Sequence, residues 1–523
     1  MEPAPPWTCL PRRSTARMMY HLMSEPKVDA PDTPLSKSLT HQTADGFLWM
    51  LAQTFGSKIF SFATQIVLAR LLAPRDFGLV ALTYTVVALV AVIRNTGLQQ
   101  ILVQRQRRFG LWANSAFWLE LTIGLTTAVT VAVAAPIAAA VYHNKNLIGL
   151  ILVVASATPL SAWFVVPSAK LMIDMRFRAL AATSIGYNLA AMGLSVTLAA
   201  LGFGAYSFVI PLPVAAVLRN IWLWRLARPP VSWRPQFRRW RFLVGDGFYM
   251  IAAGFLSSTI FGSGSLALGL FYTKAVVGQF FFAQNLSMQV AQLLSQNLGN
   301  VLLPALAKLQ NDRQRLVNAL LRALRMLSFL AVPTSLLVAV AAYPIIVLVY
   351  GAKWAPAVPL LQVMAVGMVF NLPGVLANSA LQSQGRFGTI FVFTLLQFPL
   401  FIVGAILGAR FGGAMGEALA WSACTLATSP TWLRLAFAGE AGWREAFGVY
   451  SGPLIASGVA LAPGLAVLWL CPSATQGPML RGVAAGASLV FFYPLSAWLF
   501  CRAEFVEIAG LARALGSRLR RAR

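Results

Sequence analysis

The chain has 523 residues, of which 58% are hydrophobic and 11% are charged, and its mean hydropathy is +0.71. Soluble domains are about 45–50% apolar and about 25% charged, so this composition argues strongly against a water-soluble enzyme. Lys and Arg number 41 against 15 Asp and Glu, a net charge of +26. In so apolar a chain this excess indicates a membrane rather than nucleic acid. The 4 cysteines are far apart without CxxC spacing, and we expect no disulfide framework, metal or cofactor.

Uncharged stretches of at least about 18 residues predict helices that cross the hydrocarbon core of a membrane. Helices are required because lipid offers the backbone no hydrogen-bond partners. Fourteen candidate spans result: 46–72, 77–103, 115–141, 147–170, 178–201, 204–226, 245–272, 276–303, 326–350, 357–381, 389–411, 413–437, 449–471 and 479–501. The predicted class is therefore an all-α polytopic membrane protein.

The positive charges predict the orientation of these spans, because short basic loops stay cytoplasmic. With a cytoplasmic N-terminus, 31 of the Lys and Arg residues fall in cytoplasmic segments and 6 in exported loops. This asymmetry predicts an even number of spans with both termini in the cytoplasm, and it favours contact with anionic lipid headgroups. Residues 1–45 lack the apolar core of a secretory signal and are interpreted as a disordered cytoplasmic leader.

An internal repeat predicts two lobes. The tripeptide Asp45–Phe47 opens the first span, and the same tripeptide opens the seventh at Asp246–Phe248. Gly78 and Gly278 also correspond, at an offset of 200. We expect six-helix lobes at 46–226 and 245–437, a basic cytoplasmic linker at 227–244, an additional helix pair at 438–501 and a basic cytoplasmic tail at 502–523. Six spans return the chain to its starting side, so the repeat is parallel, as in transporters that rock one lobe against the other.

Three cations lie inside predicted spans of the first lobe: Lys58, Arg94 and Arg219. A charge in hydrocarbon costs about 2.5–3.5 kcal/mol on insertion scales, so each needs an explanation. If they face inward, they form a cationic pocket open to the cytoplasm; the alternative is that they extend toward the membrane surface. Asn95 and Gln99 add a polar stripe beside Arg94.

The eighth span carries a longer stripe of amides. Asn285, Gln289, Gln292, Gln296 and Asn300 follow one another at spacings of 4, 3, 4 and 4, which places them on one helical face. Amides donate and accept hydrogen bonds, which suits sugar hydroxyls or water in a cavity. Hydrogen bonding between packed helices is the alternative interpretation.

Four motifs carry a resemblance to a known family: Gly46–Trp49, Ala69–Gly78, Gly97–Gln104 and Gly278–Asn285. The chain resembles the polysaccharide-transport branch of the multidrug/oligosaccharidyl-lipid/polysaccharide exporter superfamily, including colanic-acid-type flippases and exopolysaccharide exporters, over roughly residues 45–440. The resemblance implies two helical bundles and transfer of undecaprenyl-pyrophosphate-linked oligosaccharide across the bacterial inner membrane. A polysaccharide polymerase and a chain-length regulator are the expected partners beside bilayer lipids, with no nucleic acid and a monomer by default.

These observations predict alternating access, in which the cations attract the pyrophosphate, the amides hold hydroxyls and the isoprenoid tail stays in lipid. A lipid-linked peptidoglycan-precursor flippase is a close alternative. A drug/cation antiporter is disfavoured because spans one and seven carry no deep carboxylate. A membrane polysaccharide polymerase would show a large exported loop, and no predicted exported loop is long. We therefore expect a transporter and no enzyme.

Overall fold

A computed structural model describes residues 56–91, 98–104, 109–232, 240, 248–289, 313–384, 386–437, 443–470, 477–502, 504–506 and 510. Every regular element among these residues is a helix. The predicted leader, most of the linker, and all but a few residues of the tail lie outside the described residues. The predicted domain boundaries therefore stay predictions.

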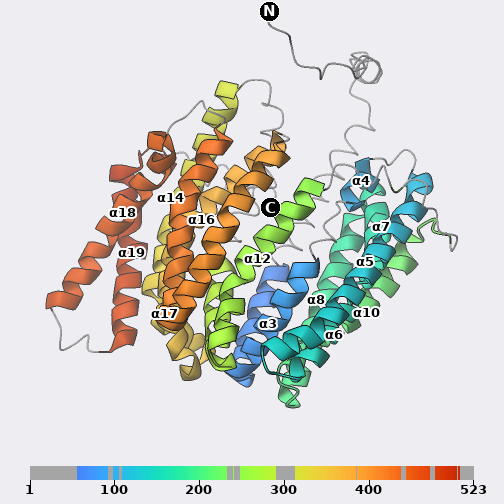
Figure 1. The fold of residues 1–523 in the computed structure, drawn as a ribbon. Helices are drawn as coiled ribbons and strands as arrows, with labels where there is room; N and C mark the ends of the chain where they lie inside the picture. Colours follow the sequence, from blue (N-terminus) through green and yellow to red (C-terminus); the bar gives the residue numbers. More distant parts are fainter. Residues whose placement is uncertain are drawn as a thin grey trace, which may run out of the picture.

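The first lobe starts with an unlabelled helix at 56–71. It continues with α3 Pro74–Ala91, α4 Leu98–Gln104, α5 Phe109–Val141, α6 Asn146–Ser156, α7 Leu160–Ile173, α8 Phe177–Ala200, α9 Tyr206–Val209 and α10 Pro211–Ala227. These helices form one side of the molecule, drawn in blue to green in Figure 1.

The second lobe starts with α12 Phe248–Phe271 and an unlabelled helix at 274–289. It continues with α14 Arg313–Val340, α15 Ala342–Pro344, the π-helical turn η3 Ile345–Tyr350, the 3-10 turn η4 Ala352–Ala357, α16 Val358–Ser383 and α17 Phe387–Ala436. The additional pair, α18 Trp443–Leu470 and α19 Pro478–Phe500, packs against α14 on the outer side of this lobe (Figure 1). The predicted class and two-lobed plan are confirmed.

The helices have the length that a membrane requires. Eight of the described helices are long and apolar enough to span a bilayer, and described helices fall wholly or partly within each predicted span. The exact count of fourteen stays a prediction. The predicted span 326–350 is interrupted at Ala341 between α14 and α15. The predicted span 147–170 is also wrong as a single helix, because the chain breaks at residues 157–159, which include Pro159, between α6 and α7. Proline lacks the backbone N–H of a continuous helix and clashes with the preceding turn.

α17 is a helical hairpin rather than one rod. Gly413 interrupts it with φ 61° and ψ −146°, a conformation open to glycine alone. The two arms then approach so closely that a side-chain carbon on Gly408 or Gly416 would collide with the opposite arm. The break agrees with the two separate spans predicted at 389–411 and 413–437.

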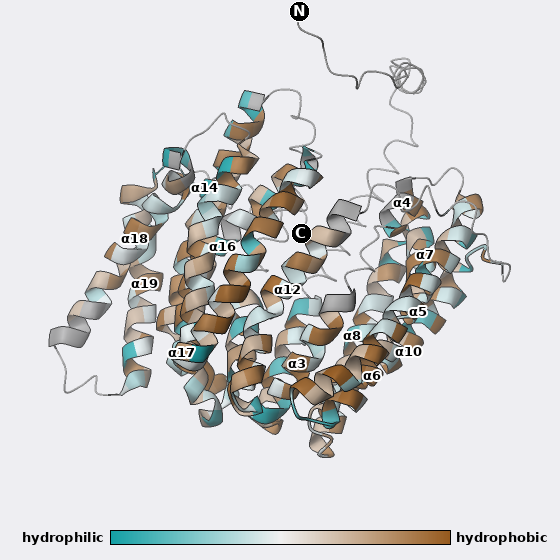
Figure 2. Ribbon diagram, viewed as in Figure 1, coloured by the Kyte–Doolittle hydropathy of each residue, from teal (hydrophilic) through white to brown (hydrophobic). Residues whose placement is uncertain are grey.

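The outer surface is apolar, as lipid requires. Val129, Val133 and Ile137 of α5 are 62–63% exposed, and Leu396 of α17 is 67% exposed. Figure 2 shows hydrophobic residues along the outer helices of both lobes. An apolar surface of this extent on a soluble protein would cause aggregation, whereas lipid accommodates it.

The two lobes repeat one another in detail where α8 and α17 begin. Arg176 and Arg386 precede these helices with nearly the same backbone angles, φ −85° and ψ 53° against φ −86° and ψ 49°. Each guanidinium donates to a carbonyl at the C-terminal end of a neighbouring helix: Arg176 to Leu226 at 3.1 Å and Arg386 to Leu435 at 2.9 Å. A cation there satisfies a terminal carbonyl and complements the helix dipole.

The lobes cross where α3 and the 274–289 helix begin. A side-chain carbon on Gly78 would collide with the carbonyl oxygen of Lys274, and one on Gly278 would collide with that of Pro74. These collisions are reciprocal because Pro74 and Lys274, like the two glycines, are 200 residues apart. The reciprocal contacts agree with a pseudo-two-fold axis that passes through this crossing and relates the two copies of the predicted repeat.

Candidate functional site

Hydrogen bonds join the lobes at the end of the molecule that carries the turns at 72–73, 272–273 and 351. We call this the latch end, at the lower edge of Figure 1. The Arg70 guanidinium, at the end of the 56–71 helix, donates to the carbonyls of Leu348 at 2.6 Å and Val349 at 2.8 Å. Arg70 belongs to the first lobe and both carbonyls belong to the second, so this contact bridges the lobes.

The second lobe returns this contact through η4. The Lys353 ammonium donates to the carbonyls of Arg70 and Leu72, at 2.7 Å each. The buried Trp354 donates its indole N–H to the carbonyl of Ala69 at 2.8 Å. Arg70, Lys353 and Trp354 form what we call the latch. All three donors satisfy carbonyls at helix ends, which otherwise lack partners.

An aromatic cluster lies directly inside the latch. Trp354 stacks on Phe282 with centroids 4.2 Å apart and meets the edge of Phe77 at 4.7 Å. Phe77 packs against Phe208 at 4.9 Å, and Phe282 packs against Tyr350 at the same separation. We call these five residues the aromatic plug. Because both lobes contribute rings, the plug closes the space between them at the latch end.

A cavity of about 360 Å³ lies on the inner side of the plug. Its walls are the 56–71 helix, α3, α8, the segment formed by α9 and the start of α10, and the 274–289 helix, so both lobes contribute. The polar side chains of its lining are Ser61, Thr64, Gln65, Tyr84, Tyr187, Asn188, Ser195, Asn285 and Gln289. We call it the first-lobe cavity, since four of its five walls belong to that lobe.

The structure places two residues of the predicted amide stripe, Asn285 and Gln289, in this cavity. Gln289 donates to the side-chain oxygen of Gln65 across the lobes, while its own Oε1 is buried without a partner among the described residues. Asn285 donates to the carbonyl of Phe281 at 2.9 Å, which leaves its amide oxygen available to a ligand. A buried acceptor without a partner costs about 1–3 kcal/mol, so a donor from a ligand or water is expected there.

Arg219 lies behind the wall of the same cavity. Its guanidinium stacks between the Phe164 ring at 4.2 Å and the Tyr187 ring at 4.5 Å, and Tyr187 lines the cavity. Its Nε is buried without a hydrogen-bond partner among the described residues. Stacking fixes the plane of the guanidinium and leaves its edge for hydrogen bonds. Arg219 is half-buried and packs against rings of α7 and α8.

The other predicted site residues are distributed differently. Lys58 is partly exposed, one helical turn from Ser61 of the lining, but is not itself part of the lining. Gln99 of α4 donates to the sulfur of Met172 at 3.3 Å, away from the cavity. The rest of the predicted site, Arg94, Asn95, Gln292, Gln296 and Asn300, lies outside the described residues.

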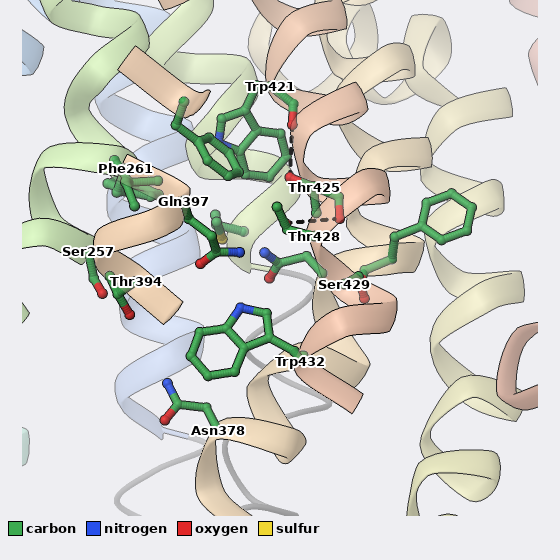
Figure 3. Close-up of a pocket in the computed structure, with 16 residues that line it drawn as sticks. Ser257, Phe261, Asn378, Thr394, Gln397, Trp421, Thr425, Thr428, Ser429 and Trp432 are labelled. Carbon is green, nitrogen blue, oxygen red and sulfur yellow. Dashed lines mark hydrogen bonds between the residues drawn. The ribbon is translucent and has the colours of Figure 1, made fainter. Parts of the chain in front are cut away.

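A second cavity, of about 220 Å³, lies within the second lobe between α12, α16 and α17. Figure 3 shows its lining, in which the Gln397 amide extends between the indoles of Trp421 and Trp432. We call it the second-lobe cavity. This cavity was not among the predicted sites, although Thr425, Thr428 and Trp432 follow the spacing of one helical face.

The walls of the second-lobe cavity correspond to those of the first. The first-lobe cavity uses predicted spans one, two, five, six and eight, and the second-lobe cavity uses spans seven, eight, ten, eleven and twelve. Spans seven, eight, eleven and twelve are the repeat counterparts of spans one, two, five and six. The two cavities therefore share four corresponding spans, but span eight of the second lobe completes the first-lobe cavity and span ten completes the second-lobe cavity.

One carboxylate is more deeply buried than its position at the start of a predicted span indicated. Glu417, on the second arm of α17, is 1% exposed, and its Oε2 has no hydrogen-bond partner among the described residues. Its other oxygen lies close to Gly264 of α12. Spans one and seven carry no deep carboxylate in the sequence, but span twelve carries the buried Glu417.

The fold and its paired cavities define a two-lobed polytopic membrane protein with the architecture of a transporter. Two solved structures are similar. The lipid II flippase MurJ in an inward closed conformation superposes with a TM-score of 0.69 at 15% identity, covering 87% of this chain and 99% of that one. An inward-facing multidrug resistance MATE transporter of the MOP superfamily gives a TM-score of 0.59 at 15% identity, covering 73% and 94%. At such identities the likeness concerns the fold alone.

Sequence comparison gives the family. Residues 67–359 match the family model described as "Polysaccharide biosynthesis protein", and the chain belongs to this family. It is 26% identical to the succinoglycan biosynthesis transport protein ExoT of Rhizobium meliloti over 71% of this chain and 75% of that protein. It is 24% identical to the lipopolysaccharide biosynthesis protein WzxC of Escherichia coli, over 73% and 78%. The resemblance to the polysaccharide-transport branch is confirmed.

Proposed function

We propose that this protein is a flippase that moves undecaprenyl-pyrophosphate-linked oligosaccharide across the bacterial inner membrane by alternating access. The observation that carries the proposal is the first-lobe cavity, which both lobes line with amides and the aromatic plug closes on one side. The named relatives are a succinoglycan biosynthesis transport protein and a lipopolysaccharide biosynthesis protein, and the structurally similar MurJ is a lipid II flippase. We expect export to feed a polysaccharide polymerase with its chain-length regulator.

The distribution of positive charge supports an orientation. At the end opposite the latch, the described chain carries Arg176, Arg228, Arg386 and Arg434 near helix termini, and the Lys and Arg residues of the sequence concentrate in the same set of loops. We propose that this end faces the cytoplasm. The latch then faces the exported side, and the described conformation is closed to that side.

The proposed roles follow from charge and hydrogen-bonding capacity. Arg219, with Lys58 and Arg94, attracts the pyrophosphate, because guanidinium and ammonium groups bind phosphate oxygens strongly. Asn285 and Gln289 then accept and donate hydrogen bonds to the sugar nearest the phosphate, together with Gln292, Gln296 and Asn300 further along the stripe. The isoprenoid tail stays in lipid, because moving it from lipid into the protein would gain little free energy.

Release requires the latch and plug to separate. Arg70, Lys353 and Trp354 contribute neutral-acceptor hydrogen bonds that form only while the lobes meet at this end. A hydrogen bond from the neutral indole contributes about 0.5–1.5 kcal/mol and one from a charged donor about 1.5–3 kcal/mol, so the set favours the state in which the latch is closed. If the cargo binds the state open to the exported side more tightly than the state closed to it, cargo binding shifts the population toward the open state.

A deletion strain tests this function. We expect undecaprenyl-linked oligosaccharide to accumulate in the cytoplasmic leaflet and surface polysaccharide to disappear, with both defects restored by the intact gene. The chain with Arg219→Leu should restore neither while reaching normal membrane levels. Arrest of peptidoglycan synthesis in place of polysaccharide loss would support the lipid-linked peptidoglycan-precursor flippase, and accumulation of a cationic drug without either defect would support the antiporter.

A further inference from the structure

The second-lobe cavity has polar groups that the fold itself does not use. Gln397 is 8% exposed and lines the cavity, and within the described part of the chain no hydrogen bond occupies its amide. Asn371 of α16, which is half-buried, lines the facing wall and also makes no hydrogen bond within the described part of the chain. The two amides together provide two acceptors and four N–H donors.

Hydroxyl groups supply further acceptors in a fixed arrangement. Thr394, Thr425 and Thr428 each donate their O–H to the carbonyl four residues earlier in their own helix, at 2.8 Å in every case. Their protons are thereby committed, and their oxygen lone pairs remain to accept hydrogen bonds. The walls formed by α16 and α17 thus present both amide donors and ordered hydroxyl acceptors to the cavity.

Aromatic surfaces complete the lining. The indoles of Trp421 and Trp432 lie on opposite sides of Gln397 (Figure 3). Phe393 meets Trp432 edge-on, with centroids 4.8 Å apart and planes at 86°, which holds its orientation. Flat apolar rings beside a few well-placed polar groups are typical of small-molecule sites. They match a pyranose, which has apolar C–H faces and hydroxyls around its edge.

Neither cavity has a Lys, Arg, Asp or Glu in its described lining. The first-lobe cavity differs in the Arg219 guanidinium that stacks on Tyr187 of its wall. A pyrophosphate or a uronic acid brought into the second-lobe cavity would lose water without gaining a counter-charge, which is costly. An uncharged sugar loses only hydrogen bonds that the amides and hydroxyls replace.

We propose that the second-lobe cavity is a binding site for an uncharged pyranose of the transported glycan, with Gln397 and Asn371 bonding its hydroxyls and Trp432 packing against its C–H face. This inference rests on the proposed flippase function and deepens it. The first-lobe cavity would take the charged pyrophosphate end, and the second-lobe cavity would take a neutral sugar further along the chain.

Saturation-transfer NMR on the full-length protein in nanodiscs tests the site. The probes are the methyl glycosides of glucose, galactose and N-acetylglucosamine, with methyl glucuronide as a charged comparison. We expect at least one neutral glycoside to give a signal that falls at least fivefold in Gln397→Leu and in Trp432→Ala, and methyl glucuronide to give none. The matched control is Trp498→Ala on α19, where the indole is 45% exposed and remote from the cavity; it should retain the signal.

Several results would overturn the site: no signal from any neutral glycoside, an equal signal from the glucuronide, or a signal that survives both cavity substitutions. Gln397→Asn guards against misfolding, since the shorter amide keeps the chemistry and should retain part of the signal. Flipping of the native lipid-linked oligosaccharide, measured on the same preparation, separates the two proposals. Flipping without glycoside binding refutes the sugar site alone, and glycoside binding without flipping refutes the proposed function.

Discussion

The two lobes share a scaffold but differ in the chemistry of their cavities. Arg176 caps the carbonyl of Leu226, and Arg219 lies seven residues before that leucine. Arg386 caps the carbonyl of Leu435, and Thr428 lies seven residues before that leucine. Equivalent positions therefore carry a guanidinium in the first lobe and a hydroxyl in the second.

The facing helices differ in the same sense. Eleven residues after its capping arginine, α8 carries Tyr187, on which Arg219 stacks, while α17 carries Gln397. The comparison teaches that the repeat determines where a cavity forms, while single residues within each copy determine what it binds. A cargo with a charged end and a neutral end suits such a pair.

The largest expected effect is at the crossing that the lobes share. Gly78→Leu and Gly278→Leu should each abolish export, because each new side chain meets a backbone carbonyl of the other lobe. Overpacking of this kind costs about 1–3 kcal/mol and sometimes more. Gly193→Leu on α8, where the space is open, is the control. Export and membrane abundance, measured together, check the prediction; normal export from either crossing variant would contradict the proposed pseudo-symmetry axis.

The second prediction concerns the charge difference between the cavities. Arg219→Leu should lower transport about 10- to 100-fold, because hydrogen bonds to a charged group contribute about 1.5–3 kcal/mol and 1.4 kcal/mol is a factor of ten. Thr428→Val, its counterpart, should lower transport less than about tenfold. Initial rates of transfer in vesicles measure both. Equal losses of transport in the two variants would contradict the proposal that the first-lobe cavity binds the charged end of the cargo and the second-lobe cavity a neutral part.

The helical arrangement was largely predictable from the sequence, whereas the site was predictable only in part. Membrane spans follow from uncharged length, because lipid leaves the backbone no other solution. The stripe of Asn285 and Gln289 was visible because helical periodicity places both on one face. The contact of Arg219 with Phe164 and Tyr187 joins three separate helices, and no periodicity within one segment reveals it.

The second-lobe cavity was missed for a related reason. A charge inside a membrane span marks a candidate site in a sequence, and this cavity has no charged residue in its described lining. Gln397 and Asn371 lie on different helices, and each alone resembles an amide that joins two packed helices. Only the tertiary arrangement shows that both face the same unfilled space.

The third prediction concerns the latch, where the lobes contribute unequal parts. Replacing Arg70 and Lys353 together with Ala removes four hydrogen bonds to carbonyls of the opposite lobe. Cysteine at position 65, in a background without native cysteines, should then react several-fold faster with an impermeant maleimide from the exported side. Arg410→Ala, at the same end but stacked within its own lobe, should leave the rate unchanged. A rate unaffected by the double substitution would show that the latch does not bias the closed state.

The smallest expected effect is at the paired arginine caps. Arg176→Ala and Arg386→Ala each remove one bond to a helix C-terminus, worth about 1–3 kcal/mol. We expect a fall in thermal midpoint of a few degrees in each. The fall should be greater for Arg386, whose bond is shorter and less exposed. Thermal unfolding of each variant in detergent checks this prediction, and a greater fall in the midpoint for Arg176→Ala would reverse the ranking.

Transfer of the cargo itself tests the central proposal most directly. The lipid-linked oligosaccharide that accumulates in the deletion strain can be purified, labelled on its glycan and placed in vesicles with the full-length protein. We expect the labelled headgroup to cross to the opposite leaflet much faster than in protein-free vesicles, and at least tenfold more slowly with Arg219→Leu. Transfer at the protein-free rate by the intact, folded protein would contradict the proposed function.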